Sequence, residues 1–503
     1  MGTKVKETQV AVIGGGIVGA AIARELSKYK VDACLLEKEP SLGWGITKGS
    51  QGLVHGGIAY LSSRIVKRLD TELDLKSFLM QELNVKERLG FVGREMFFEL
   101  APLLNAKIVQ CGRMMVAENQ EELDTLKMVK EVAEENGIED IEILDRQGLE
   151  EKEPLINPKF VGGLYDPSEG TIFPLEWVIA FGENAKDNGV NVLTETEVRG
   201  IEEKRGCYLI KTTDGPIKAE YIVNAAGLFA DDVSAMIGRD YFSIFFYHCQ
   251  MLVLENKDYI SHVVARLPQP GHPRMLIPTT EGNILVVHTM TRETNKHNLS
   301  TTRDGLSDYL HNIPKDLIPT ISPRKDMISS FVGFLAFNTR FPEDYLIEFP
   351  KKRFVNAVIC APGLGPSPAI AQEVVRMLGD EGLELVEKSD FNPYRFQESR
   401  FIDLSSDEKN RKILENPRYG HIICRCEKVS EQEVVMAIRR GAKTIDDIKF
   451  RTRAGMGRCQ GGFCTSRVLQ ITARELGVSP LTLRKKGGNS YLLRSETKTL
   501  NAP

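Results

Sequence analysis

The stretch QVAVIGGGIVGAAIA, residues 9–23, decides the expected fold of this 503-residue chain. Gln9 to Ile13 is apolar and predicts a strand, Gly14 to Gly19 is glycine-rich, and Ile17 to Tyr29 has the apolar spacing of a helix. A second apolar strand follows at Asp32 to Leu36. This order of strand, turn, helix and strand predicts the start of an α/β domain.

The glycines of that turn satisfy the spacing G-x-G-x-x-G at Gly14, Gly16 and Gly19. Glycine permits a tight turn, lets the backbone approach a pyrophosphate and lets the helix, from Ile17 on, pack closely. The helix N-terminus favours an anion, and Glu37 closes the next strand, where it can accept from ribose hydroxyls. The spacing predicts a dinucleotide site and leaves NAD and FAD both open.

Composition places the chain among globular proteins of two or three domains. A formal net charge of -4 and 7% aromatic residues give no sign of nucleic-acid binding or disorder. No run approaches the roughly 18 apolar residues that a membrane span needs. Nine cysteines, an odd number, do not form a disulfide framework, so we expect a reducing cytoplasmic location.

Three separated α/β segments are expected to form one nucleotide-binding domain, and two segments between them a β-rich α+β substrate domain. A polar stretch without clear periodicity is expected to link these domains to a small helical C-terminal domain. The predicted ranges are 1–74, 146–241 and 331–388 for the nucleotide-binding domain, 75–145 and 242–330 for the substrate domain, 389–419 for the linker, 420–477 for the C-terminal domain and 478–503 for a basic tail.

The C-terminal part carries four cysteines in two pairs, Cys424 with Cys426 and Cys459 with Cys464. From Gly420 onward, 16 Lys and Arg oppose 7 Asp and Glu, whereas the rest of the chain has 49 against 62. Basic surroundings favour thiolates, and four thiolates hold either a zinc ion or an iron–sulfur cluster. A [2Fe-2S] cluster also accounts for the location, because it carries single electrons away from a two-electron cofactor.

Residues from Gln9 to about Gly379 resemble the D-amino-acid oxidase superfamily of flavoproteins. The likeness rests on the N-terminal fingerprint, on Asn224-Ala-Ala-Gly227 and on Gly363-Leu-Gly365, whose backbone N–H groups in that family lie near the flavin. Val198 matches a position whose backbone meets adenine. The residues that the resemblance implies for FAD binding are Gly14, Gly16, Ile17, Gly19, Glu37, Lys38, Thr47, Ser50, Gly52, Val198, Ala226, Gly227, Gly363, Leu364 and Gly365.

The segment GWGITKGSQGLVHGGIAYL, residues 43–61, resembles the HSG or HGG segment of FAD-dependent glycerol-3-phosphate dehydrogenases and oxidases and of L-2-hydroxyglutarate oxidases. The resemblance places Thr47 to Gly52 along the flavin and His55 on the substrate side. Oxidation of an alcohol by hydride transfer requires a base for the hydroxyl proton, and histidine suits that role near neutral pH. A purely local hydrogen-bonding role for His55 stays open.

An anionic substrate needs a cationic partner, and Arg274, ahead of an Ile-Pro pair, matches a substrate-binding arginine of the glycerol-phosphate enzymes. Lys48 and Tyr60 are possible helpers, and a surface ion pair is the alternative for Arg274. The chain departs from those enzymes at Ala59 and Leu335, where they carry arginine. Arg340 and Arg292 are the available replacements.

The segment from His421 to Cys464 resembles the bacterioferritin-associated ferredoxin-like domain, including CRCE and TRAGMGRCQGGFC. The resemblance implies a [2Fe-2S] cluster on Cys424, Cys426, Cys459 and Cys464. Nearby cations offset the cluster charge, namely Arg425, Lys428, Arg453 and Arg458.

These features predict an α/β fold: a discontinuous Rossmann-like FAD-binding domain, a β-rich α+β substrate domain and a small all-helical iron–sulfur domain. The predicted function is FAD-dependent oxidation of glycerol 3-phosphate to dihydroxyacetone phosphate by hydride transfer to flavin N5, with electrons leaving through the cluster. The alternatives are a dehydrogenase of a 2-hydroxy acid or an imino or amino acid, and a non-catalytic FAD and iron–sulfur electron-transfer subunit. Expected partners are a small anionic substrate and a protein electron acceptor or second flavoprotein subunit in a hetero-oligomer, with no nucleic acid.

Overall fold

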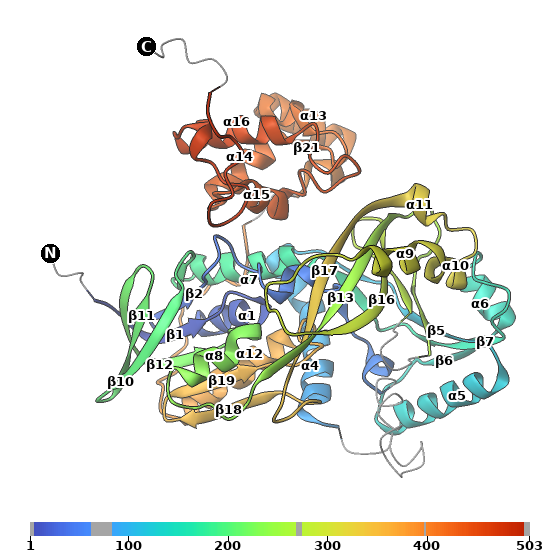
Figure 1. The fold of residues 1–503 in the computed structure, drawn as a ribbon, viewed down its shortest axis with the longest axis horizontal. Helices are drawn as coiled ribbons and strands as arrows, with labels where there is room; N and C mark the ends of the chain where they lie inside the picture. The colour runs from blue at the N-terminus through green and yellow to red at the C-terminus, as the bar shows by residue number, and fades with distance from the viewer. Residues whose placement is uncertain (1–4, 62–82, 268–273, 397–398, 497–503) are drawn as a thin grey trace.

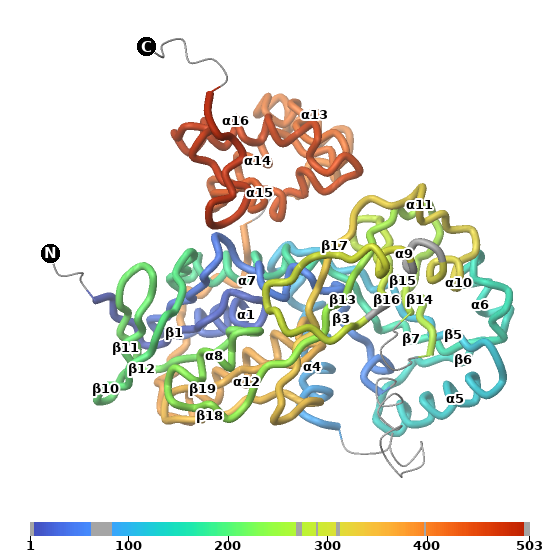
Figure 2. Tube along the Cα trace, viewed as in Figure 1, coloured from blue at the N-terminus to red at the C-terminus, as the bar shows by residue number. Residues whose placement is uncertain are grey.

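The computed structural model describes residues 5–61, 83–267, 274–396 and 399–496, which form two large sheets with helices around them (Figure 1). The domain boundary predicted at residues 74 and 75 lies outside the described residues. Distant segments meet in the first sheet, as the Cα trace shows by its blue, green and orange strands (Figure 2). In the described ranges, no helix combines the length and the apolar character that a membrane span requires.

The first large sheet contains the N-terminal strand, turn and helix. Its order is β10-β11-β12-β1-β2-β9, and β19 and β18 extend it beside β12. The central pairs are parallel, as predicted, and β10, β11 and β18 pair in antiparallel fashion. The strands are β1 (Lys6–Ile13), β2 (Ala33–Leu36), β9 (Asn191–Leu193), β10 (Val198–Lys204), β11 (Cys207–Thr212), β12 (Gly215–Asn224), β18 (Leu346–Lys351) and β19 (Phe354–Val358).

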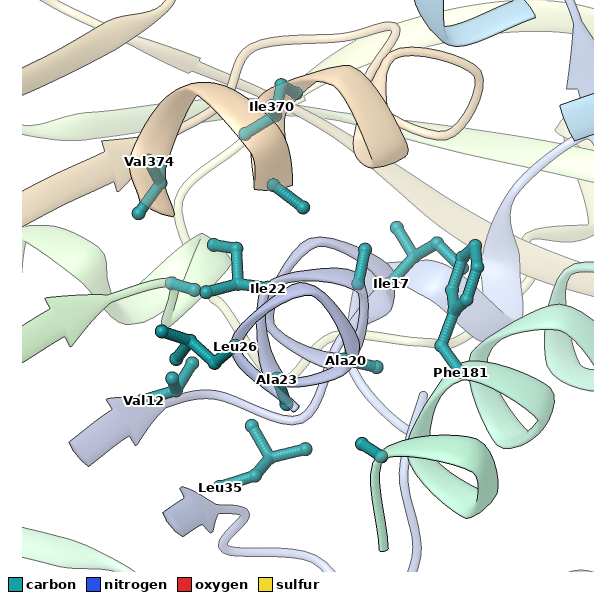
Figure 3. Packing of buried hydrophobic residues seen from close by; sticks show 14 of the residues in the cluster. Val12, Ile17, Ala20, Ile22, Ala23, Leu26, Leu35, Phe181, Ile370 and Val374 are labelled. Atoms are coloured by element: carbon teal, nitrogen blue, oxygen red, sulfur yellow. The ribbon is translucent and has the colours of Figure 1, made fainter. Parts of the chain in front are cut away.

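Helix α1 (Ile17–Leu26) is buried on almost every side, between strands of the first sheet and two neighbouring helices. Val12 of β1 and Leu35 of β2 lie beneath it, while α7 (Pro174–Asp187) and α12 (Ser367–Asp380) flank it (Figure 3). Apart from Arg24 and Glu25 the helix is apolar all round, and a helix of that kind is stable when it is buried in this way. The same core contains residues of α4 (Val85–Leu104), although that helix falls in the range predicted for the substrate domain.

The second large sheet has the order β17-β13-β16-β15-β14-β5-β7-β6. Helix α10 (Ile313–Leu317) packs on one face, and α5 (Gln120–Glu135) packs on the opposite face over β5 and β7. The strands are β5 (Arg113–Ala117), β6 (Glu142–Asp145), β7 (Gly162–Asp166), β13 (Ile244–Glu255), β14 (Val263–Arg266), β15 (Met275–Pro278), β16 (Asn283–Glu293) and β17 (Met327–Asn338). A small sheet joins β3 (Leu53–Val54), β8 (Gly170–Ile172) and β4 (Ile108–Gln110).

Two strands of the second sheet lie in ranges that the sequence analysis gave to the nucleotide-binding domain. These are β7, inside 146–241, and β17, which crosses the boundary at residue 331. A short strand such as GGLYD carries no pattern that selects a partner, so pairing in the folded chain decides its sheet. The remaining helices are α6 (Arg146–Lys152), α8 (Ala230–Ala235), α9 (Arg303–His311) and α11 (Pro323–Asp326), with 3-10 turns η1 (Ile46–Gly49) and η3 (Gly227–Phe229).

The C-terminal module sits above the rest of the molecule, with α15 nearest to α7 (Figure 1). Its helices have clear caps: Ser430 forms a capping box with Glu433, Thr444 accepts from the Asp447 N–H, and α16 ends at left-handed Gly477. Its elements are η4 (Phe401–Asp403), α13 (Ser406–Glu415), η5 (Pro417–Gly420), β20 (Ile422–Cys424), β21 (Val429–Ser430), α14 (Glu431–Arg439), α15 (Ile445–Thr452), α16 (Thr465–Leu476) and η6 (Pro480–Thr482).

Two expectations for this end of the chain need correction. The module is not all-helical, because β20 and β21 form a hairpin that brings Cys424 back toward the start of α14. The predicted linker contains α13, whose polar sequence leaves no buried residue and therefore no apolar period to detect. The basic tail, to which the sequence assigned no element, contains η6, a bridge between Arg484 and Tyr491 and an ion pair between Arg484 and Glu195.

One buried carboxylate on α7 attaches the module to the rest of the protein. Glu183 pairs with Arg395 at 2.8 Å, with Arg440 at 2.9 Å and with Arg451. Burial would raise the pKa of Glu183, but the three guanidinium groups outweigh it and lower the pKa. The excess positive charge of the C-terminal part thus partly serves to dock it onto the acidic rest of the chain.

Two further contacts extend this docking interface. Arg453 and Arg400 both pair with Glu281, in the turn between β15 and β16. Trp44 meets Phe450 of α15 edge to face, with ring centroids 5.5 Å apart. Trp44 lies two residues before η1, so the module contacts the chain next to the segment Thr47 to Gly52, which is expected to lie along the flavin.

Candidate active site and cofactor-binding residues

The turn between β1 and α1 leaves no room for side chains at two of its glycines. Gly14 has a φ of +109°, and a Cβ there would lie 2.4 Å from the carbonyl oxygen of Ala225. A Cβ on Gly19 would lie 1.9 Å from the Gly14 oxygen. The turn therefore closes only with glycine, and it joins the predicted Ala225-Ala226-Gly227 element to the N-terminal fingerprint.

The start of α1 has no side-chain cap from its N-cap residue, Gly16. The Ile17 N–H donates to Thr47 Oγ1 at 3.0 Å, which ties η1 to the helix end. The other N–H groups of the first turn have no intrahelical partner, and the helix dipole favours an anion there. This arrangement fits the pyrophosphate of a dinucleotide.

Glu37 follows β2 and is buried. Its carboxylate accepts from the Gly15 N–H at 2.8 Å and from the Glu39 N–H at 2.9 Å. Burial raises the pKa of Glu37 to about 7, and the two N–H groups only partly oppose that shift. A ribose whose hydroxyls donate to this carboxylate would stabilise its charged form, so Glu37 fits the predicted role.

The remaining FAD candidates lie in several separate segments of the chain. A Cβ built on Gly365 would lie 3.7 Å from Val54 Cα and from the His55 backbone nitrogen. The loop before α12 therefore lies against the chain that leads into His55. Lys38 Nζ lies 3.5 Å from the Phe229 ring centroid. The others occupy η1 and the turn after it (Thr47, Ser50, Gly52), the start of β10 (Val198), the turn after β12 (Ala226, Gly227) and the loop before α12 (Gly363, Leu364).

His55 follows β3 and lies beside a buried glutamate. Its Nδ1 is 3.0 Å from Glu169 Oε1, and the same carboxylate accepts from Arg113 Nη2 at 2.8 Å and from the Gly56 N–H at 2.7 Å. An ionised carboxylate only accepts, so in the neutral imidazole Nδ1 carries the hydrogen and Nε2 is the acceptor. The His55 side chain is 17% exposed, whereas Glu169 is fully buried.

The charge on Glu169 is held firmly. Burial alone would raise its pKa, but the charges of Arg113 and His55 and the hydrogen bonds from His55 and the Gly56 N–H prevail and lower the pKa to about 2. Sequence reasoning missed Glu169 and Arg113. Their only sequence cue is a charged residue at the start of a short apolar strand, Arg113 in RMMVA and Glu169 before GTI.

A second carboxylate fixes the chain after His55. Asp166 accepts from the Ile58 N–H at 3.2 Å and from the Ser168 N–H at 2.8 Å. A Cβ on Gly56 would lie 2.5 Å from Asp166 Oδ2, so the close approach of the two carboxylates to this turn requires glycine. The HGG sequence is therefore explained by packing around His55.

The predicted substrate-binding residues separate in the structure. Tyr60 lies beside His55, with ring centroids 5.8 Å apart, and burial followed by the charge of Glu169 raises the pKa of its hydroxyl. Lys48 lies elsewhere, with its Nζ 5.5 Å from the ring centroid of Trp44, the residue that meets Phe450 of the module. Burial lowers the pKa of Lys48, although the nearby charge of Glu39 opposes that shift.

Arg274 lies on the face of the second sheet that packs against α10. Its Nη1 is 3.8 Å from Asp316 of α10, and it projects to the same face as Leu276, two residues on, which packs with α10. The opposite face of β15 contains Ile277, which packs with Leu53, two residues before His55. The structure therefore does not bring Arg274 and His55 together.

The four C-terminal thiols lie in two close pairs, Cys426 with Cys459 and Cys424 with Cys464. Cys426 Sγ and Cys459 Sγ are 3.6 Å apart, close to the roughly 3.7 Å between two sulfurs on one tetrahedral ion with bonds of about 2.3 Å. Cys464 hydrogen-bonds with Cys424, and burial raises its pKa to about 12. No three of the described His, Cys, Asp and Glu side chains are already arranged around one ion position.

The backbone around Cys459 also suits a bound cluster. The N–H groups of Phe463, Gly461 and Gly462 hydrogen-bond to its sulfur and lower the pKa of that thiol. Metal charge would favour the thiolate form at buried Cys464 as well. The donor set fits four cysteine ligands of a [2Fe-2S] cluster.

Comparisons with known proteins agree with these two sites. The family described as FAD dependent oxidoreductase matches residues 9–377, which is most of the chain. The chain belongs to this family of FAD-dependent oxidoreductases. The BFD-like [2Fe-2S] binding domain matches residues 422–474 of the oxidoreductase. The predictions of FAD, of a [2Fe-2S] domain and of an α/β flavoprotein fold are thereby confirmed.

Individual relatives show which enzymes of this family the chain is similar to. The oxidoreductase is 36% identical over 499 residues to glycerol 3-phosphate dehydrogenase of Caloramator mitchellensis, covering 97% of this chain and 99% of the relative. Mitochondrial L-2-hydroxyglutarate dehydrogenase of Homo sapiens is 27% identical over 243 residues, which cover 46% of this chain and 48% of that relative. The solved structure of dithionite-reduced L-alpha-glycerophosphate oxidase from Mycoplasma pneumoniae with FAD bound is similar to this chain, with a TM-score of 0.69 at 25% identity. The match covers 78% of this chain and 100% of the oxidase chain.

Proposed function

We propose that this oxidoreductase oxidises glycerol 3-phosphate to dihydroxyacetone phosphate and passes the electrons through its [2Fe-2S] cluster to a protein acceptor. The observation that carries the proposal is His55, whose Nε2 is left as an acceptor by the bond between Nδ1 and Glu169. The full-length likeness to a glycerol 3-phosphate dehydrogenase supports the choice of substrate. We also propose a cytoplasmic location and a hetero-oligomer that includes the acceptor or a second flavoprotein.

In the proposed reaction, His55 Nε2 takes the proton of the substrate hydroxyl as the carbon loses hydride. Bound FAD supplies the hydride acceptor, at N5 of its ring. Glu169 orients the imidazole and stabilises the positive charge that His55 gains. Arg113 keeps Glu169 ionised, so the pair acts on the substrate only through His55.

Arg292 is our candidate for the substrate phosphate, in place of Arg274. Arg292 pairs with Tyr247 of β13 across the sheet, and Tyr247 pairs in turn with Leu335, where the related enzymes carry arginine. Paired residues of neighbouring strands project to the same face, so Arg292 lies in the row of the missing arginine. Within the described residues no ion pair engages Arg292, whereas Arg340 lies 4.0 Å from Glu348.

Anaerobic mixing of the holoenzyme with glycerol 3-phosphate tests the proposal. We expect bleaching of the flavin absorbance, slowed at least about a hundredfold by His55→Ala while FAD stays bound. His262→Ala is the matched control, because His262 also bonds a buried glutamate, Glu153 at 2.8 Å. Normal reduction in His55→Ala would remove His55 from the role, and the absence of bleaching in the wild type would refute the substrate.

A second candidate substrate is a 2-hydroxy acid such as L-2-hydroxyglutarate. Leu335 in place of an expected arginine favours it, because it weakens the phosphate site and leaves the flavin and His55 unchanged. The same bleaching assay with 2-hydroxy acids and with proline separates these substrates. Flavin that no small compound reduces, but that a partner protein does reduce, would make the chain an electron-transfer subunit.

A further inference from the structure

The cysteine loops of the C-terminal module have one buried side and one open side. Cys424 is 1% exposed and Cys464 is 2% exposed, whereas Cys426 is exposed. Phe463, next to Cys464, is 76% exposed, although large aromatic side chains are usually buried. The cluster site therefore meets solvent at Cys426 and Phe463.

The other side of these loops faces the catalytic part of the chain. Arg453 pairs with Glu281 at 3.5 Å, and Arg458, next to Cys459, pairs with Glu255 and donates to the Lys325 carbonyl. The cluster site thus lies between the docking interface and the open side. Such a position suits a relay that receives electrons on one side and releases them on the other.

Three cations lie beside the open side and do not pair with the catalytic part of the chain. Arg425, Lys428 and Arg467 are exposed, and in the described ranges none of them forms an ion pair. By contrast, Arg440, Arg451, Arg453 and Arg458 of the same module pair with carboxylates of the catalytic part. The rest of the chain carries 49 Lys and Arg against 62 Asp and Glu, so the local positive field contrasts with an acidic background.

We propose that Arg425, Cys426, Lys428, Phe463 and Arg467 form the docking surface, here called the exit face, for a one-electron redox protein with an acidic surface around its own centre. This rests on the proposed function only in taking the electrons to come from substrate. Oxidation of one glycerol 3-phosphate releases two electrons and two protons. Two molecules of the acceptor each take one electron by way of the cluster, and the protons pass to solvent.

The size and chemistry of the exit face favour this partner. Electron-transfer complexes are small and transient, so a few residues around an exposed ligand suffice. Charge complementarity raises the association rate and orients the two redox centres, and it does so without requiring a high affinity. An exposed aromatic ring among cations gives the centre of such a contact an apolar anchor.

The test uses the full-length holoenzyme, reduced beforehand with dithionite and freed of excess reductant. Cytochrome b5, an acidic one-electron acceptor, and cytochrome c, a basic one, are mixed with it at low ionic strength. In the variant Lys428→Glu with Arg467→Glu, we expect the second-order rate constant for cytochrome b5 to fall at least about tenfold and that for cytochrome c to rise. The difference should vanish at high salt. Arg411→Glu with Arg494→Glu is the matched control, since both are exposed cations outside the cysteine loops.

The absorbance of the cluster before mixing shows that each variant retains it. An unchanged cytochrome b5 rate in the exit-face variant would overturn the proposal, as would an equal loss in the control. Loss of binding to vesicles of anionic phospholipid, with no change in cytochrome b5 reduction, would assign the exit face to a membrane surface and also overturn it. Because the electrons come from dithionite, failure of glycerol 3-phosphate to reduce the flavin would refute the proposed function alone.

Discussion

Replacement of Glu169 by glutamine tests the role of the buried carboxylate behind His55. Glutamine keeps the shape of the side chain but removes the charge that Arg113, His55 and the Gly56 N–H share. Its amide group offers hydrogens where the carboxylate only accepted, so at least one of these three donors loses its partner. We expect Glu169→Gln to affect both stability and the rate of flavin reduction.

The size of the stability effect follows from the charge. Lowering the pKa of Glu169 from its usual 4.5 to about 2 corresponds to about 3 kcal/mol of unfolding free energy at neutral pH. The substitution also leaves Arg113, whose side chain is 7% exposed, as a buried cation without its partner. Breaking such a buried pair costs about 3–5 kcal/mol, so we expect a loss in that range.

The pH dependence has a definite sign. The folded protein holds Glu169 at a pKa below its unfolded value, so its contribution is complete above about pH 4.5 and is lost as the pH falls toward 2. The Glu169→Gln variant lacks this contribution. The difference in unfolding free energy between wild type and variant should therefore shrink over that window.

Urea denaturation and anaerobic stopped-flow reduction by substrate measure the two effects. We expect flavin reduction to slow by about a hundredfold, because His55 loses the acceptor that fixes its tautomer and orientation. Asp166→Asn is the control, since Asp166 is equally buried and holds the Ile58 N–H without touching His55. Glu169→Gln with wild-type flavin reduction, or Asp166→Asn with an equal loss of rate, would refute a specific role for Glu169.

Three further substitutions test other parts of the structure. Cys459→Ser should abolish the iron–sulfur absorbance and onward electron transfer while flavin reduction by substrate continues; loss of both would make the module purely structural. Gly19→Ala should raise the FAD dissociation constant at least about tenfold, measured by flavin fluorescence, because its Cβ would lie 1.9 Å from the Gly14 oxygen. Glu183→Gln should weaken docking of the module by about 3–5 kcal/mol and speed proteolysis between the two parts. Unchanged proteolysis in Glu183→Gln would contradict the role of Glu183; the control is Glu197→Gln, whose side chain is 37% exposed and pairs with Arg199.

Local sequence determined the features that depend on short stretches of chain. The β1–α1 turn was predictable because a strand, three spaced glycines and an apolar helix are adjacent in sequence, and Gly14 and Gly19 admit no other residue. The caps of α14 and α15 were predictable for the same reason, since each needs only residues three positions apart. The cysteine pairs and His55 were found through their neighbours in the motif.

Tertiary structure alone decided which distant residues meet. Glu169 reaches His55 because β8 pairs with β3, and Arg113 joins them at the start of β5. Arg274 was assigned from its local motif, but alternation along β15 turns it toward Asp316 and away from His55. The basic composition of the C-terminal part was visible in the sequence. Its use for docking on Glu183 was not, because the free energy of a buried charge depends on partners that only folding brings within reach.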